Sequence, residues 1–258
     1  MTTFIELAPN WKRSLTLNHP VMLVTRQWNA SPFGALVTPP LTARSRAAAP
    51  NPRVIEIPGG FLFRNGAANP GVSRFIEKYK EAWAKNSAPI IVALAAQTEN
   101  DWASLAARLE RVEGVGGIEL HLNPTVDAAR AIKRVRALTD LPILAKLDLE
   151  NARAIASLCV DAGANALVIG RAPRGARMVA GRIWHGRIYG AFIRPIVLDM
   201  VNEIVALKLD APLIACGGVH STGNVREYLS AGASAVEIDT AHWVDAELVA
   251  QVCIELEI

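Results

Sequence analysis

Short apolar runs rich in β-branched residues alternate with segments of helical periodicity along most of the chain. Strands that are covered on both faces lose the alternation of polar and apolar side chains, so such runs indicate a buried parallel sheet. Eight of these runs are bounded by Pro, Gly or Asp: residues 21–24, 35–38, 89–95, 117–122, 142–147, 166–170, 212–216 and 235–240. From the third run onward, helical spacing is found in residues 102–113, 126–138, 151–162, 194–206 and 224–231. Alternation of this kind predicts βαβ units with right-handed crossovers.

Eight such strands in 258 residues fit a closed (β/α)₈ (TIM) barrel of the α/β class better than an open sheet. A doubly wound sheet is the weaker alternative, because no GxGxxG sequence follows the first strand. No linker, repeat or low-complexity segment is evident, so residues 1–258 are expected to form a single domain. In a barrel of this type the functional residues follow the C-terminal ends of the strands.

Two stretches are expected to be loop insertions at that face. Residues 44–71, rich in Pro, Gly, Asn and Arg, are too irregular for a helix and follow the second strand. Residues 171–190 follow the sixth strand. Long connections in compact domains usually serve as lids or binding loops.

Composition excludes several classes of protein. Hydrophobic residues make up 51% of the chain, enough for a large core and too many for a disordered protein. No apolar run approaches the roughly 20 residues of a membrane span, and no signal segment opens the sequence, so a cytoplasmic protein is expected. Three cysteines without metal-type spacing argue against a disulfide framework and a zinc site. A net charge of +3, with Arg residues spread along the chain, gives no indication of a nucleic-acid partner.

The strongest local feature is Gly217-Gly218 at the end of the seventh strand, followed by an eighth strand that ends at Thr240. Glycines expose main-chain N–H groups, and the ends of the last two strands of a barrel commonly form a phosphate site. The alternative is a Gly-rich turn that only allows strand and helix to pack closely.

With these motifs the chain resembles the dihydroorotate dehydrogenase family, whose members are FMN-dependent (β/α)₈ barrels. The resemblance covers nearly the whole chain and rests on several segments that are weak alone and specific together. These are Leu17-Asn-His-Pro-Val21, Gly34-Ala-Leu-Val-Thr38, Asn51-Pro-Arg-Val-Ile-Glu56, Asn65-Gly-Ala-Ala-Asn-Pro-Gly-Val72, Ala145-Lys-Leu147 and Tyr189-Gly-Ala-Phe-Ile-Arg-Pro195.

The resemblance implies FMN as cofactor. It assigns the flavin phosphate to main-chain groups around Gly190, Gly217, Gly218 and Thr240, and it assigns Lys146 to the flavin itself. An unpaired ammonium inside a barrel is costly, and a positive charge near the flavin would stabilise its reduced anion. The alternative for Lys146 is a structural ion pair with a carboxylate such as Glu119 or Glu237.

The chain also departs from the family pattern at positions that matter for the reaction. Pro39 stands where the family has a lysine, and Phe63 and Gly170 stand where it has asparagines. The family's Cys or Ser base after the fourth strand has no counterpart in His121-Leu-Asn-Pro-Thr125. Asp239 replaces the glycine before Thr240, and a carboxylate about 4 Å from a phosphate would cost roughly 1 kcal/mol in water.

His121 is the titratable side chain on the strand end that matches the missing base, and imidazole titrates near neutrality. It is the candidate catalytic residue, with a hydrogen-bonded structural histidine as the alternative. His185 and Arg187, in the insertion after the sixth strand, could hold an anion or could be solvated loop residues. Cys216 is expected to be a small buried hydrophobe rather than a nucleophile.

Three functions therefore stay open. The first is a flavin oxidoreductase that acts on dihydroorotate or a related small acid. The second is a repurposed barrel of the same family that has lost the chemistry and the FMN. The third is an FMN-independent phosphate-binding isomerase or lyase that uses His121 and Lys146 as acid and base. The expected partners are a small-molecule substrate and, because the family's soluble members commonly dimerise, a second copy of the chain; neither nucleic acid nor a membrane is expected, and no metal.

Overall fold

Eight parallel strands close into a barrel in the order β10-β13-β14-β3-β4-β7-β8-β9. The computed structural model describes residues 4–28, 32–122, 127–245 and 247–256. The barrel strands are β3 (Val21–Val24), β4 (Ala35–Val37), β7 (Ile90–Leu94), β8 (Val115–His121), β9 (Ile143–Asp148), β10 (Ala166–Arg171), β13 (Leu213–Cys216) and β14 (Ala235–Ile238). Each begins and ends within two residues of a predicted strand. The predicted (β/α)₈ barrel is confirmed.

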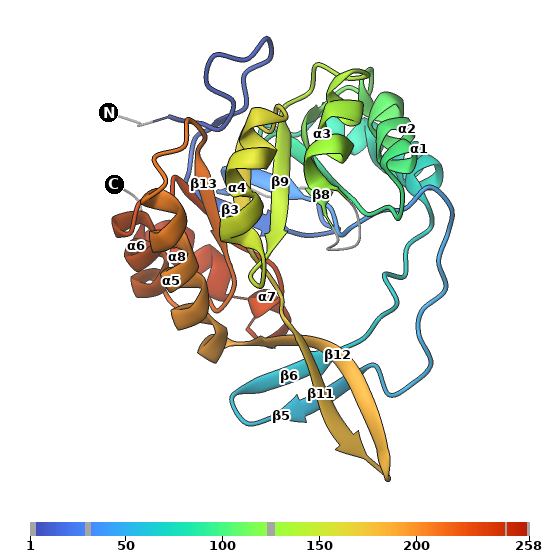
Figure 1. Ribbon diagram of the computed structural model, residues 1–258, viewed down its shortest axis with the longest axis vertical. Coiled ribbons are helices and arrows are strands. Elements are labelled where there is room, and N and C mark those ends of the chain that lie inside the picture. The colour runs from blue at the N-terminus through green and yellow to red at the C-terminus, as the bar shows by residue number, and fades with distance from the viewer. Residues whose placement is uncertain (1–3, 29–31, 123–126, 246, 257–258) are drawn as a thin grey trace.

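Helices surround the barrel (Figure 1). They are α1 (Val72–Ala84), α2 (Glu99–Leu109), α3 (Ala128–Arg136), α4 (Ala152–Asp161), α5 (Arg194–Val205), α6 (Thr222–Ser230), α7 (Ala241–Val244) and α8 (Leu248–Glu255), with a short 3₁₀ turn at Ala191–Ile193. The five predicted helices are confirmed as α2 to α6, and position 126 of the second prediction lies outside the described residues. Helix α2 begins three residues earlier than predicted because the Thr98 side chain caps it by accepting from Asp101 N at 3.2 Å. Helices α1, α7 and α8 were not predicted.

Alternation along each strand separates two apolar layers. On β9, Ile143, Ala145 and Leu147 pack outward against the helices, whereas Leu144 packs inside the barrel. Because successive side chains of a strand point to opposite faces, Lys146 shares the inward direction of Leu144. By the same alternation, the side chains of Glu119 and His121 on β8 and of Glu237 on β14 point into the barrel. The barrel interior therefore carries polar side chains near the C-terminal ends of β8, β9 and β14, whereas the other strands contribute apolar side chains such as Val24, Val37 and Val168.

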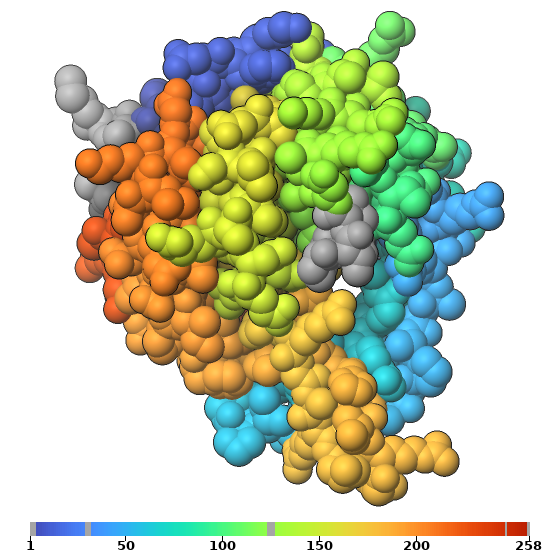
Figure 2. Space-filling model, viewed as in Figure 1, coloured from blue at the N-terminus to red at the C-terminus, as the bar shows by residue number. Residues whose placement is uncertain are grey.

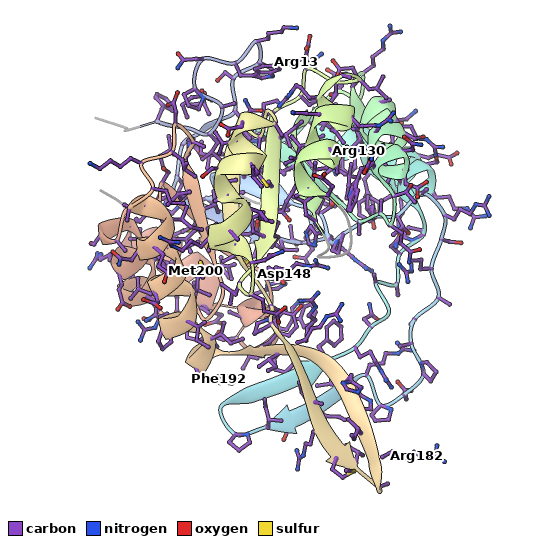
Figure 3. All side chains as sticks on the ribbon, in the orientation of Figure 1. Arg13, Arg130, Asp148, Arg182, Phe192 and Met200 are labelled. Atoms are coloured by element: carbon purple, nitrogen blue, oxygen red, sulfur yellow. The ribbon has the colours of Figure 1, made fainter. Side chains whose placement is uncertain are left out.

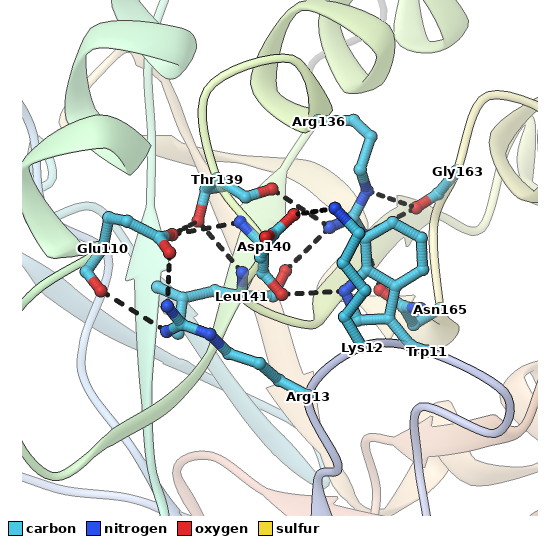
Figure 4. Close-up of polar contacts among 10 residues, drawn as sticks. All are labelled: Trp11, Lys12, Arg13, Glu110, Arg136, Thr139, Asp140, Leu141, Gly163 and Asn165. Atoms are coloured by element: carbon cyan, nitrogen blue, oxygen red, sulfur yellow. Dashed lines mark hydrogen bonds and ion pairs between the residues drawn. The ribbon is translucent and has the colours of Figure 1, made fainter.

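The N-terminal segment covers the end of the barrel where the strands begin. A short hairpin, β1 (Ile5–Glu6) and β2 (Thr16–Leu17), precedes the barrel. Trp11 Nε1 donates to the carbonyl of Asp140 at 2.7 Å, and the Arg136 guanidinium lies 4.0 Å from a Trp11 ring centroid (Figure 4). Lys12 also pairs with Asp140 at 2.9 Å. With this end closed, the end where the strands finish carries the open surface.

The two insertions meet in a four-stranded antiparallel sheet at that open end. Its strands are β5 (Val54–Ile57), β6 (Gly60–Phe63), β11 (Arg174–Val179) and β12 (Arg182–Gly190), in the order β11-β12-β6-β5. Figures 1 and 2 show this sheet projecting from the molecule opposite the N-terminal segment. Residues 44–71 were predicted to be a loop insertion that is too irregular for a helix; the strands β5 and β6 within it were not predicted. The pairing of β6 with β12 is a long-range contact that local sequence does not reveal.

Candidate functional site

One cavity of about 1170 Å³ lies between the C-terminal ends of the barrel strands and the projecting sheet. Its volume is sufficient for a cofactor together with a small substrate. All six residues that the sequence singled out line it: His121, Lys146, Gly190, Gly217, Gly218 and Thr240. The structure thus brings together residues from β8, β9, β12 and the loops after β13 and β14.

Lys146 is the centre of a buried ionic cluster on the floor of this cavity. Its ammonium forms an ion pair with Glu237 and lies 3.5 Å from Oε1 of Glu119. Both carboxyl groups are fully buried, and within the described part of the chain their Oε2 atoms have no hydrogen-bond partner. The structural ion pair considered for Lys146 is therefore present with both carboxylates, and the lysine still lines the cavity.

Two buried carboxyl groups approach one ammonium, and burial and charge together shift the pKa values of Lys146 and Glu237. Burial alone would lower the pKa of Lys146, but the neighbouring acidic groups, Glu119 and Glu237 among them, raise it well above its ordinary value. Burial, followed by the charge of Glu119, raises the pKa of Glu237 to about 7. Lys146 thus remains charged at neutral pH, and Glu237 titrates near it.

His121 lies next to Lys146 across the β8–β9 pair. Its Nε2 is 2.6 Å from Oε1 of Glu119. Burial, and after it the positive charges of Lys146 and Arg171, holds the pKa of His121 well below its ordinary value. The imidazole is therefore neutral at pH 7. If Nε2 carries the proton and donates to Glu119, Nδ1 keeps a lone pair that can accept a proton.

The loop after β13 has the geometry of an anion cradle. Gly217 and Gly218 have φ angles of 130° and 65°, which side chains rarely adopt. A Cβ atom on Gly218 would lie 2.6 Å from the main-chain nitrogen of Arg194. Within the described ranges, the main-chain N–H groups of Gly217, Gly218 and Thr240 have no hydrogen-bond acceptor. These free donors on the cavity wall suit a phosphate.

Asp239 lies at the edge of the same cradle. It is half-buried and lines the cavity. Burial raises its pKa to about 6, although the charge of Lys146 opposes the shift. Above that pH Asp239 adds a negative charge to the phosphate end of the cavity. The cradle therefore fits a phosphate best when Asp239 is protonated.

The structure explains one departure from the family pattern and locates two others. Gly170 has a φ of 119°, and a Cβ there would lie 1.8 Å from the carbonyl oxygen of Cys216, so this backbone cannot accept an asparagine. Pro39 and Phe63 both line the cavity, where they present apolar surface. Residues 123–126, which stand in the sequence where the family has its base-bearing segment, lie outside the described residues.

Sequence reasoning missed two sets of cavity residues. The first is an aromatic group on the projecting sheet and on α7: Phe61, Tyr189 and Trp243 join Phe63. The second is Arg171, which reaches the cavity together with Arg187. The signal in the sequence was the apolar and aromatic content of residues 60–63 and 182–190, which is typical of strands.

Three further histidines and Cys216 also line the cavity. His185 and His220 are exposed, and His242 is half-buried. Cys216 is buried and donates to Glu237 at 3.6 Å, and burial raises its thiol pKa well above the ordinary value, so it packs as a small buried side chain. Over the described ranges, no cluster of three or more His, Cys, Asp or Glu side chains is arranged to hold a metal ion. No described helix is long and apolar enough to cross a membrane.

Comparison with known proteins places this geometry in context. The family described as dihydroorotate dehydrogenase matches residues 22–258. Two relatives are 32% identical over 249 residues, which are 87% of this chain and 80% of theirs: the "Dihydroorotate dehydrogenase B (NAD(+)), catalytic subunit" of Desulforudis audaxviator and that of Citrifermentans bemidjiense. A protein of the same description from Geobacter sulfurreducens is 28% identical over 275 residues, covering 94% of this chain and 90% of its own length.

Proposed function

The chain belongs to the dihydroorotate dehydrogenase family, and from that premise we propose that it is an FMN-dependent oxidoreductase acting on a small organic acid. One observation carries the proposal. The main-chain N–H groups of Gly217, Gly218 and Thr240, which have no acceptor among the described residues, line the same cavity of about 1170 Å³ as Lys146.

The two ends of this cavity offer groups that suit the two ends of FMN, its phosphate and its ring. Its phosphate would accept hydrogen bonds from the N–H groups of Gly217, Gly218 and Thr240, and the Gly190 main chain would border it. Lys146 would hold a positive charge against the isoalloxazine ring. When bound, FMN supplies the redox chemistry by accepting a hydride equivalent from the substrate. The protein's part is to bind, to orient and to move a proton.

His121 is proposed as the base that takes the substrate proton. It is neutral at pH 7 and borders Lys146. The contact with Glu119 at 2.6 Å orients the ring and stabilises the imidazolium that forms when the proton arrives. An oriented base of this kind typically contributes 10² to 10⁴ in rate.

A second candidate is the repurposed barrel that no longer holds FMN. The observation in its favour is the ionic cluster, because Glu237 and Glu119 already neutralise Lys146 and Asp239 adds negative charge at the phosphate end. In that case the cavity would bind a ligand without oxidising it.

The visible absorbance spectrum of the freshly purified protein, with mass spectrometry of any ligand it releases, separates these functions. The oxidoreductase requires a flavin spectrum and a released mass equal to that of FMN, in the purified protein or after reconstitution. Failure to take up FMN in both cases would sink the proposal and leave the repurposed barrel or the FMN-independent enzyme. Steady-state assays with dihydroorotate and a range of electron acceptors then test whether dihydroorotate itself is the substrate.

The proposal extends to setting and partners. A family member of this kind would take part in pyrimidine biosynthesis if dihydroorotate is its substrate, and we expect it in the cytoplasm. The expected partners are the small-molecule substrate and a second copy of the chain. Sedimentation of the purified protein tests the homodimer.

A further inference from the structure

Two arginines that line the cavity, Arg171 and Arg187, share the carboxylate of Asp148. Nη1 of Arg187 is 3.1 Å from Oδ1 of Asp148, and Nη1 of Arg171 is 3.4 Å from Oδ2. The same Nη1 atoms donate to the carbonyls of Ala172 and Leu122 at 2.6 and 2.7 Å. Two positive charges therefore face one negative charge, and the group carries a net charge of +1.

The donors that remain on these arginines are available to a ligand. Within the described residues, Nε and Nη2 of both Arg171 and Arg187 have no acceptor, and these nitrogen atoms are not fully buried. Both side chains are about one-fifth exposed, at 21% and 23%, and both line the cavity. The Nε and Nη2 edge of a guanidinium is a fork that matches the two oxygens of a carboxylate.

An aromatic surface adjoins the arginine pair. Arg187 on β12 lies directly opposite Phe63 on β6, and Tyr189 lies opposite Phe61. Cross-strand partners and positions two apart share one face of a sheet. The rings contact each other: Phe61 stacks on Tyr189 with centroids 5.4 Å apart, and Phe63 meets Trp243 edge to face at 5.3 Å. Trp243 is 54% exposed, so its ring also borders solvent.

We propose that Arg171 and Arg187 bind the carboxylate of an apolar arylcarboxylic acid whose ring lies on the aromatic surface of Phe61, Phe63, Tyr189 and Trp243. This inference rests on the proposed function, since it names the substrate class of the same cavity. A pyrimidine carboxylate is the poorer ligand, because the polar edges of its ring would meet Phe63 rather than an amide, and a buried polar group without a partner is costly. Arg171 and Arg187 bind the negative charge of the ligand, and the aromatic surface favours an apolar ring.

Equilibrium binding of cinnamate, followed by isothermal titration calorimetry on the purified protein, tests the proposal. Three further probes are benzamide, which lacks the charge, acetate, which lacks the ring, and orotate, which has a polar ring. Cinnamate should bind at least ten-fold more tightly than each of them. FMN content is measured in the same preparation, so a protein without flavin and a protein without affinity for cinnamate are separate results.

Four variants locate the site. Arg171→Gln and Arg187→Gln should each weaken cinnamate binding about ten-fold or more. Asp148→Asn should strengthen it several-fold, because the competing carboxylate is lost. Arg182→Gln is the matched control, since Arg182 is exposed at the outer tip of the β11–β12 hairpin, away from Asp148 (Figure 3); it should leave binding unchanged. Circular dichroism and thermal melting verify that each variant is folded.

Asp148→Asn is expected to strengthen cinnamate binding, whereas the arginine variants are expected to weaken it. The Asp148 variant therefore tests the proposal even if an arginine variant folds poorly. An arginine pair with a purely structural role would give no gain in binding on removal of Asp148. The proposal is overturned if Asp148→Asn leaves cinnamate binding unchanged or weakens it, if benzamide binds as well as cinnamate, or if orotate binds more tightly than cinnamate.

Discussion

Lys146 and Glu237 form an ion pair across the interior of the barrel, although β10 and β13 separate their strands, β9 and β14. Both side chains are buried, and Glu119 approaches the same ammonium from β8 at 3.5 Å. The cavity floor is therefore a coupled group of charges rather than a single lysine. Its net charge depends on the protonation of Glu237, whose pKa burial raises to about 7.

Removal of the lysine should destabilise the fold strongly. Lys146→Met leaves Glu119 and Glu237 buried without a counter-charge, and breaking a buried pair costs about 3–5 kcal/mol. The double variant Lys146→Met/Glu237→Gln should recover a large part of that loss. Urea unfolding of the wild type, both single variants and the double variant measures the coupling. Additive effects of the two substitutions would contradict the ion pair.

Glu237→Gln should change how stability depends on pH. The pKa of Glu237 is about 7 in the folded chain and close to its ordinary value of 4.5 in the unfolded chain. Between these values the folded state binds more protons, so this carboxyl makes the wild type less stable as pH rises. Relative to wild type, the variant should gain about 3 kcal/mol between pH 4 and pH 8, most of it from pH 4.5 to pH 7, and nothing further at higher pH. Unfolding free energies across this range test the prediction; a constant difference would refute it.

Gly218→Ala should impair both stability and FMN binding. At a φ of 65° any side chain is strained, and the new Cβ would lie 2.6 Å from the Arg194 nitrogen. Gly181→Ala is the matched control, because Gly181 has a similar φ of 73° and a Cβ there would meet nothing within 4 Å. The control should lose about 1 kcal/mol or somewhat more from backbone strain and keep its FMN affinity. Equal FMN affinity in the two variants would show that the cradle does not hold the phosphate.

Asp239→Asn should strengthen FMN binding in a pH-dependent way. The carboxyl has a pKa of about 6, so it is charged at pH 7.5 and largely neutral at pH 5. A repulsion of about 1 kcal/mol corresponds to roughly a five-fold change in affinity. Fluorescence titration with FMN should show this advantage over wild type at pH 7.5 and only a small one at pH 5. An advantage that does not grow with pH would place the Asp239 charge away from the phosphate.

His121→Asn should slow the reductive half-reaction without abolishing flavin binding. The expected loss is about 10² or more in rate. Because the pKa of His121 lies well below 6.5, the wild-type rate should not fall on account of this base as pH drops from 8 to 6.5. Stopped-flow measurements of flavin bleaching at several pH values test both statements. A variant as fast as wild type would exclude His121 as the base.

Much of the fold follows from local pattern. The eight apolar runs gave the barrel strands, and helical spacing gave α2 to α6, because each of these elements buries a face that its own sequence displays. Helix α1 carries such a face too, with Val72, Phe75 and Trp83 buried. The spacing of these three residues is the local signal for this helix, although no helix was predicted there.

The sequence by itself determined that the barrel exists and that Lys146, His121 and the Gly217-Gly218 turn gather at one end of it, because strand direction and a period of two decide where such side chains point. Only the tertiary structure decided what surrounds them. The pairing of Lys146 with Glu237, the meeting of β6 with β12, and the placing of Arg187 opposite Phe63 join segments far apart along the chain. Contacts of that kind depend on how strands close and pair in space, and no local pattern records them.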